Sequence, residues 1–106
     1  MEVGSQLKKG FLDMSVLAIL KRNDSYGYSL IQEMKALIEV PESTLYPILK
    51  RLVNKKYLKS YSKEHNGRLR KYYQITALGI EHLDASIKEW QQLKIIIDTM
   101  SEKKGD

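Results

Sequence analysis

The sequence predicts a mainly α-helical fold that carries one β-hairpin and ends in a long helix. Apolar residues recur at helical spacing in four segments, only two prolines interrupt 106 residues, and one Asn-Gly pair separates two short tyrosine-rich runs. The length is that of a single compact unit. We divide it into an N-terminal part, residues 1–75, and a C-terminal helix, residues 76–106.

The first predicted helix spans about residues 5–22. Its centre reads FLDMSVLAIL, which is too long for one strand and contains no Gly or Pro, so we expect a largely buried helix at the centre of the fold. A second helix is predicted after a turn-rich stretch, with Asp24 or Ser25 as N-cap, and it ends before Pro41. Its apolar positions follow helical spacing: Leu30, Ile31, Met34, Leu37 and Ile38.

The third predicted helix begins near Ser43 and has one apolar face. Because proline is tolerated only near a helix start, Pro47 indicates that residues 43–47 form the opening turn. The face away from the apolar stripe is polar and basic, as a recognition helix requires: its first residues can meet base edges and its basic side chains can reach phosphates. The candidate DNA-binding residues here are Ser43, Thr44, Tyr46, Pro47, Lys50 and Arg51.

A β-hairpin is predicted next, with strands at about 57–63 and 69–76. Asn66-Gly67 favours a tight turn, because both residues tolerate positive φ. A basic hairpin directly after a recognition-type helix is a wing that can contact the DNA backbone or the minor groove. Tyr72 and Tyr73 point to opposite faces of their strand, so one belongs to the core and the other is free for contact, and the sequence leaves open which. The candidate DNA-binding residues of the wing are Arg68, Arg70 and Lys71.

The last predicted helix runs from about Thr76, its N-cap, to Lys103. At this length it reaches roughly 40 Å and overhangs its own domain. Its apolar end would be exposed in a monomer, so we expect a two-fold homodimer. The alternative is that this helix folds back over the first helix of the same chain. The expected interface residues are Leu83, Ile87, Trp90, Leu93, Ile96, Ile97 and Met100.

Positive charge is concentrated in one fifth of the chain. Residues 50–71 contain nine Lys or Arg and a single acid, Glu64, whereas the other 84 residues carry nine basic and twelve acidic residues. Such a positive segment on a mildly acidic domain is typical of a protein that binds a polyanion, most often nucleic acid. The charge pattern alone is also consistent with a solvated lysine-rich loop that binds nothing.

The sequence gives little support for metal binding, catalysis or membrane insertion. The chain has no cysteine, and His65 and His82 lack companions at metal-ligand spacing, so no metal or other cofactor is expected, and Glu81 and His82 are assigned to a solvated helix face. No catalytic triad, carboxylate pair or phosphate-binding loop stands out, so the chain is not expected to be an enzyme. No apolar run approaches about 18 residues and the N-terminus lacks a signal-peptide layout, which predicts a cytoplasmic protein without membrane contact.

The segments ESTLYPILKRLVNKKYL, GRLRKYYQIT and TALG, together with LAIL and YGYSLIQEMK, resemble the PadR family of bacterial transcriptional regulators over about residues 8–97. The short C-terminal part is similar to the small subgroup that includes a lactococcal multidrug-responsive repressor. The resemblance implies a dimeric winged helix-turn-helix repressor whose partner is a double-stranded DNA operator.

The resemblance also suggests a ligand for Trp90. In the multidrug-responsive relative, a tryptophan at the matching place, in a pattern like SIKEWQQL, lines a pore at the dimer interface and stacks on flat aromatic drugs. Two such rings across a two-fold axis can hold a planar aromatic small-molecule effector. The alternative, which needs no ligand, is that Trp90 only fills the dimer interface. Phe11 and Lys94 are the other candidate ligand-binding residues, and Glu89 and Asp98 are expected to line the same pore.

Three functions therefore compete: a sequence-specific repressor, a nonspecific DNA or RNA binder, and a dimeric winged-helix module that contacts protein. The combination of recognition-type helix, basic hairpin and family resemblance favours the repressor.

Overall fold

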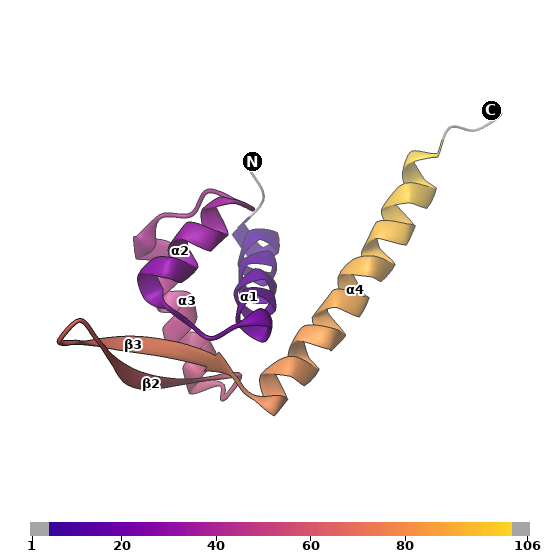
Figure 1. Cartoon of the computed structure of the whole chain (residues 1–106). Helices are drawn as coiled ribbons and strands as arrows, with labels where there is room; N and C mark the ends of the chain where they lie inside the picture. Colours follow the sequence, from indigo (N-terminus) through magenta and orange to yellow (C-terminus); the bar gives the residue numbers. More distant parts are fainter. Residues whose placement is uncertain (1–4, 103–106) are drawn as a thin grey trace.

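The computed structural model describes residues 5–102, which form four helices and a small antiparallel sheet (Figure 1). The order is α1 (Ser5–Arg22), β1 (Ser25–Tyr26), α2 (Gly27–Lys35), α3 (Glu42–Asn54), β2 (Leu58–His65), β3 (Arg68–Ile75) and α4 (Ala77–Ser101). The predicted class, mainly α with a hairpin wing and a long last helix, is confirmed. None of the described helices is both long and apolar enough to cross a membrane.

α1 is the central helix, as its apolar centre predicts. Leu12, Val16, Leu17 and Leu20 are at most 2 % exposed, and α1 contacts all three other helices as well as β3. Around it, α2, α3 and the base of the sheet close a single core. The buried residues contributed by these elements are Leu30, Ile31, Met34, Leu45, Ile48, Leu49, Leu52, Leu58 and Tyr73.

The second helix is shorter than its apolar pattern predicts. α2 ends at Lys35, and the chain then turns, with the N–H groups of Leu37 and Ile38 both donating to the carbonyl of Met34. Ile38 is buried from this turn, whereas Leu37 is 63 % exposed, although both follow the helical spacing of the apolar positions. Spacing alone could not show that the chain leaves the helix before this residue.

α3 also begins one residue earlier than predicted, so that Pro47 is its sixth residue and lies beyond the opening turn. Pro47 has no N–H to donate to the carbonyl of Ser43. Ser43 is exposed, so water can satisfy that carbonyl, and the helix continues to Asn54.

The hairpin forms as the Asn-Gly pair predicts. His65 pairs with Arg68, and Asn66 and Gly67 between them have φ of 52° and 79°, the left-handed values of a tight two-residue turn. The strands run closer to the tip than predicted, and β3 is central in the order β1-β3-β2. β1, which the sequence analysis missed, pairs Ser25 and Tyr26 with β3.

α4 starts against the chain segment that ends α3. The N-cap Thr76 accepts a hydrogen bond from the N–H of Gly79 at 3.0 Å and donates its hydroxyl to the carbonyl of Lys56 at 2.6 Å. The backbone N–H of Thr76 donates to the carbonyl of Tyr57 at 3.0 Å. His82 is not on a solvated face, because its ring stacks on Tyr57 at 4.2 Å between ring centroids.

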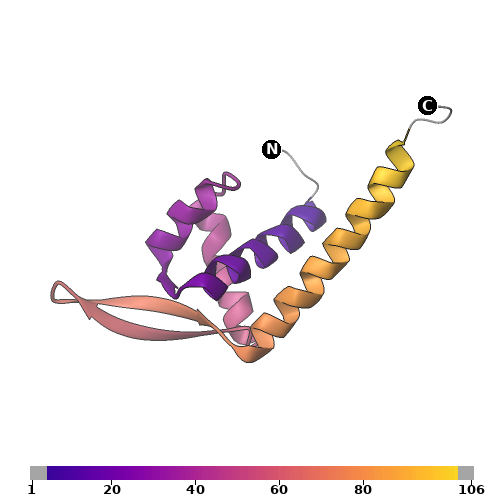
Figure 2. The same cartoon turned by 45° about the vertical axis from the view of Figure 1, so that its right-hand side comes forward.

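The last turns of α4 extend beyond the rest of the molecule (Figure 2). The molecule measures 66 × 27 × 21 Å, so the predicted overhang is confirmed. From residue 91 to residue 102 every residue of the chain is exposed.

Candidate nucleic-acid interface

α3 presents an exposed ridge along the side opposite the core. Its inward stripe, Leu45, Ile48, Leu49 and Leu52, is at most 4 % exposed. The outward residues are exposed and include four of the six predicted for DNA contact. These outward residues are Ser43, Tyr46, Pro47, Lys50 and Asn54.

A groove of about 350 Å³ separates this ridge from the wing. Tyr46, Lys50 and Asn54 line it from α3, and Lys71 and Tyr73 line it from β3. Two positive side chains therefore face each other across a concave strip, and none of the described residues that line it is acidic. This shape and charge suit a sugar–phosphate backbone.

The two adjacent tyrosines of the wing, Tyr72 and Tyr73, face opposite sides of the sheet, and it is Tyr73 that faces the core. Tyr73 is 7 % exposed and faces the core, and this burial, with Tyr46 nearby, raises the pKa of its hydroxyl above the ordinary value. Tyr72 lies on the outer face, where its ring stacks on Tyr61 at 5.6 Å and meets the edge of Tyr26 at 5.5 Å. Tyr72 is therefore part of an aromatic row that spans the three strands.

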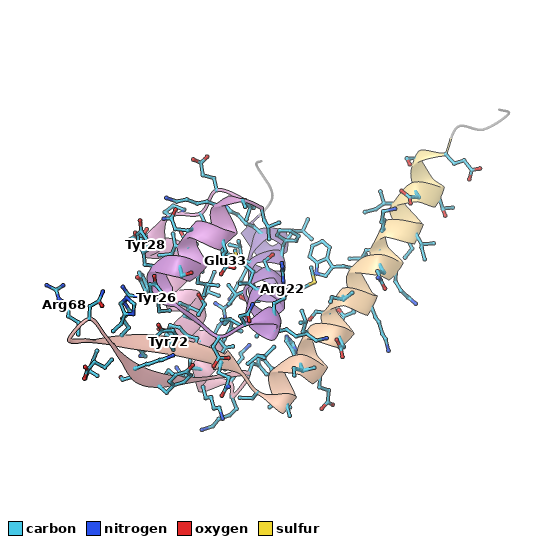
Figure 3. All side chains as sticks on the ribbon, viewed as in Figure 1. Arg22, Tyr26, Tyr28, Glu33, Arg68 and Tyr72 are labelled. Carbon is cyan, nitrogen blue, oxygen red and sulfur yellow. The ribbon has the colours of Figure 1, made fainter. Side chains whose placement is uncertain are left out.

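The basic residues of the wing lie on both of its faces. Lys71 shares the face of Tyr73, toward α3, whereas Arg70 lies on the outer face with its guanidinium carbon 4.3 Å from the ring centroid of Tyr26. Arg68 lies at the tip, and Figure 3 shows it on the same side of the molecule as Tyr26 and Tyr28. The predicted wing residues are thus accessible, but they do not form one flat patch.

Arg51 is placed differently from the prediction. It is half-buried, and its guanidinium donates to the carboxylate of Asp13 on α1. Burial raises the pKa of Asp13 above its ordinary value, and the charges of Arg51 and Lys55 oppose that rise. The expectation that Arg51 stands beside Lys50 on the exposed face was wrong, because α1 brings a carboxylate to this side of α3. Thr44 is also partly covered.

The candidate set also left out Tyr26, Tyr28 and Asn54, which line grooves beside α3. Tyr26 and Tyr28, from β1 and the start of α2, line a groove of about 230 Å³ together with Tyr46, Arg70 and Lys71. Asn54 lines the groove between α3 and the wing. Helical spacing places Asn54 on the outward face, but no signal in the sequence shows that a two-residue strand brings Tyr26 to Arg70.

The three candidate ligand-binding residues come together between α1 and α4. The rings of Phe11 and Trp90 meet edge to face, with centroids 6.0 Å apart. They line a groove of about 290 Å³ whose other walls are Met14, Ile87, Gln91 and Lys94. Glu89 and Asp98 are not among the residues that line it, and Asp98 instead pairs with Lys94 at 3.2 Å.

The predicted interface residues divide into two groups. Leu83 is 1 % exposed within a single chain and belongs to its core, so its assignment to an interface with a second chain was wrong. Ile87 is partly buried against the same core. The more distal residues are 43–71 % exposed: Leu93, Ile96, Ile97 and Met100.

The architecture is that of a winged-helix transcription regulator, with a helix-turn-helix formed by α2 and α3 and a wing formed by β2 and β3. The family model of the "Transcriptional regulator PadR-like family" matches residues 16–85. The chain belongs to this family. Its members are regulators that bind DNA and not enzymes.

Individual relatives agree with this membership. The chain is 36 % identical over 105 residues to an uncharacterised protein of Lysinibacillus sphaericus, with 94 % of this chain and 96 % of the relative covered. A solved structure from Streptococcus mutans is 42 % identical, with a TM-score of 0.81 over 92 % of this chain and 94 % of that one. A PadR-like transcriptional regulator from Bacillus cereus is 29 % identical, with a TM-score of 0.83 over 94 % of this chain and 100 % of that one.

Proposed function

We propose that this chain is a dimeric repressor that binds a pseudo-palindromic DNA operator and is released by a planar aromatic ligand bound beside Trp90. Residues 1–75 would bind DNA, residues 76–106 would dimerise, and the protein would act in the cytoplasm, where the chromosome lies. The observation that carries the proposal is the exposed ridge of α3 beside a groove lined by Lys50 and Lys71.

The DNA-binding part of the proposal divides the residues by role. Tyr46 stands on the exposed ridge, where a helix can meet base edges in the major groove, and Thr44 lies beside it. Arg68 and Lys71 belong to the wing and would contact phosphates. Substitution of Arg68 or Lys71 by Ala is expected to weaken binding to all duplexes alike, whereas changes at Thr44 or Tyr46 alter the preference among them.

The test is selection of an operator from random duplexes, followed by competition binding. A repressor prefers a pseudo-palindrome with half-sites about 10 bp apart by roughly a thousandfold or more over random DNA. Equal affinity for any duplex, or for RNA, would favour a nonspecific binder. Absence of DNA binding that weakens between about 50 and 200 mM salt would favour a protein-interaction module.

Dimerisation is supported by the apolar end of α4. Four residues spaced by three and four positions, at 93, 96, 97 and 100, share one face and stay exposed in the single chain. Such a strip on a projecting helix is typical of an interface, and a two-fold axis would let the same strip cover its copy.

Light scattering tests the dimer at micromolar concentration. The wild-type chain is expected at the mass of two chains, and Ile97→Asp at the mass of one, because it introduces a charge where the strip would be buried. Lys88→Asp changes an exposed residue of the same helix outside that strip and is expected to leave the dimer intact. A wild-type mass of one chain would refute the dimer.

Ligand sensing is supported by the groove between α1 and α4. Trp90 and Phe11 offer aromatic surfaces at right angles, and the groove opens on the same helix that carries the apolar strip. A planar ring can stack on Trp90 there, and a second copy would close the open side.

Dye binding tests the ligand site. A planar cationic dye is expected to quench the fluorescence of Trp90, the only tryptophan in the sequence. The fluorescence anisotropy of the dye itself is expected to rise on binding. Trp90→Leu should abolish the anisotropy change, whereas Tyr28→Leu, an exposed aromatic outside the groove, should preserve it. A Trp90 that no dye can quench would contradict ligand sensing.

A further inference from the structure

A second groove lies along the other side of α3, between this helix and the N-terminal half of α1. Its volume is about 410 Å³. The partly covered Thr44 and the exposed Pro47 line it from α3, and Lys8 and Lys9 line it from α1. The remaining lining residues are Leu12, Ile48 and Arg51. The ridge of α3 therefore stands between two grooves, one toward the wing and one toward α1.

The charge of this second groove is positive. Among the residues that the structure describes, three cationic side chains line it and no acidic one does. Arg51 is already paired with Asp13, and the charge of Lys9 also acts on that carboxylate. Beyond the Arg51–Asp13 pair, the positive charge of the described lining comes from Lys8 and Lys9. These two lysines lie outside the basic segment 50–71, and only the fold brings them beside the recognition helix.

A helix in the major groove has one sugar–phosphate backbone on each side. The major groove is about 12 Å wide, close to the diameter of a helix with its side chains, so both backbones come against the flanks of the helix. Lys50 and Lys71 suit one backbone, in the groove beside the wing. The groove toward α1 has the matching position and charge for the other.

We propose that the groove between α1 and α3 receives the second DNA backbone, with Lys8 and Lys9 as phosphate contacts. This inference rests on the proposed DNA binding and adds a contact surface outside the recognition helix and the wing. The exposed ring of Pro47 would lie against deoxyribose. Each protomer would then hold its half-site from both sides, which fixes the rotation of α3 in the major groove.

The salt dependence of operator binding tests this proposal. The slope of log K against log salt is negative, and removal of one lysine–phosphate interaction on B-DNA reduces its magnitude by about 0.9. Lys8→Ala/Lys9→Ala is therefore expected to reduce that magnitude by roughly 1.8 per protomer. If the variant and the wild-type protein bind equally at 1 M salt, each lysine removed makes binding at 0.15 M salt roughly fivefold weaker than that of the wild type. The matched control is Lys21→Ala/Arg22→Ala, which removes two charges from the opposite end of α1.

Phosphate-ethylation interference gives the location of the phosphates that the protein touches. The wild-type protein is expected to show interference on both strands that border each half-site, and Lys8→Ala/Lys9→Ala to show only one of the two clusters. An unchanged slope and pattern for this variant, with Lys71→Ala still weakening binding, would overturn the inference and leave the proposed function standing. An equal decrease in the control pair would overturn it as well, because the effect would be one of net charge. Failure of every variant to alter DNA binding would instead refute the proposed function.

Discussion

Replacement of Gly79 by Ala tests the junction between α3 and α4. A Cβ at this position would lie 2.2 Å from the carbonyl oxygen of Tyr57 and 2.8 Å from Cγ1 of Ile75. Ordinary contacts begin at 3.4 Å, so the start of α4 must move away from the Tyr57 backbone by about 1.2 Å. That movement stretches the hydrogen bonds of Thr76 to the Tyr57 and Lys56 carbonyls, which are 3.0 and 2.6 Å long.

The magnitude follows from opposing effects. Overpacking costs about 1–3 kcal/mol and each weakened hydrogen bond up to about 1 kcal/mol, whereas Ala in place of Gly favours a helix by at most about 1 kcal/mol. We expect Gly79→Ala to lower the free energy of unfolding by about 2 kcal/mol, which lowers Tm by on the order of 10 °C.

Gly10→Ala is the matched control for this substitution. Gly10 also lies inside a helix, α1, but a Cβ there meets no atom within 4 Å, so the same change should raise the free energy of unfolding by about 0.5–1 kcal/mol. Urea denaturation at one fixed protomer concentration measures both variants, because the proposed dimerisation would make stability depend on concentration. Equal stabilisation by the two substitutions would refute the close approach of α4 to Tyr57.

Three other predictions concern single side chains. Lys56 has φ of 70°, so Lys56→Gly should raise the free energy of unfolding by about 1 kcal/mol in urea denaturation, and a decrease would contradict the left-handed end of α3. Arg51→Ala should lower the free energy of unfolding by about 1–3 kcal/mol, because it leaves a half-buried carboxylate on α1 unpaired. Lys50→Ala should change that free energy by less than about 0.5 kcal/mol but weaken operator binding. The reverse pattern would restore Arg51 as the DNA contact. The hydrogen bond that Tyr61 donates to the carboxylate of Asp24 raises the tyrosine's pKa above its ordinary value of 10.0. Alkaline absorbance titration should therefore show two late tyrosines, Tyr61 and Tyr73, of which only Tyr61 shifts down in Asp24→Asn. Because the folded chain holds this proton more tightly than the unfolded chain, its stabilisation is complete below pH 10 and is lost as the pH rises through the folded pKa; a titration that Asp24→Asn leaves unchanged would argue against the bond.

Local signals in the sequence predicted the features that depend on neighbouring residues. Asn66-Gly67 determines its turn through positive φ, and Thr76 caps α4 through its own hydroxyl. The outward face of α3 follows from helical spacing, because the buried stripe leaves only one side for polar residues. These predictions needed no knowledge of how distant segments meet.

The features that the sequence analysis missed depend on contacts between distant segments. Arg51 turns toward Asp13, which is 38 residues away, and the charge pattern of α3 alone cannot reveal that partner. Leu83 has the spacing of an interface residue, but it is buried in the core of its own chain. β1 is two residues long and is defined only by its pairing with β3.

The junction at Tyr57 links the two halves of the proposed repressor. The carbonyl of Tyr57 accepts a hydrogen bond from the N–H of Thr76 and lies against Gly79. The N–H of Tyr57 donates a hydrogen bond to the carbonyl of Leu52 in the last turn of α3. One backbone residue therefore joins the end of the recognition helix to the start of the helix that carries Trp90. In the proposed dimer, a ligand that changes the tilt of α4 would move Tyr57. α3 would move with it, because Tyr57 is in close contact with both helices. The same contact explains why Gly79, and not a residue with a Cβ, stands at this point in the TALG segment.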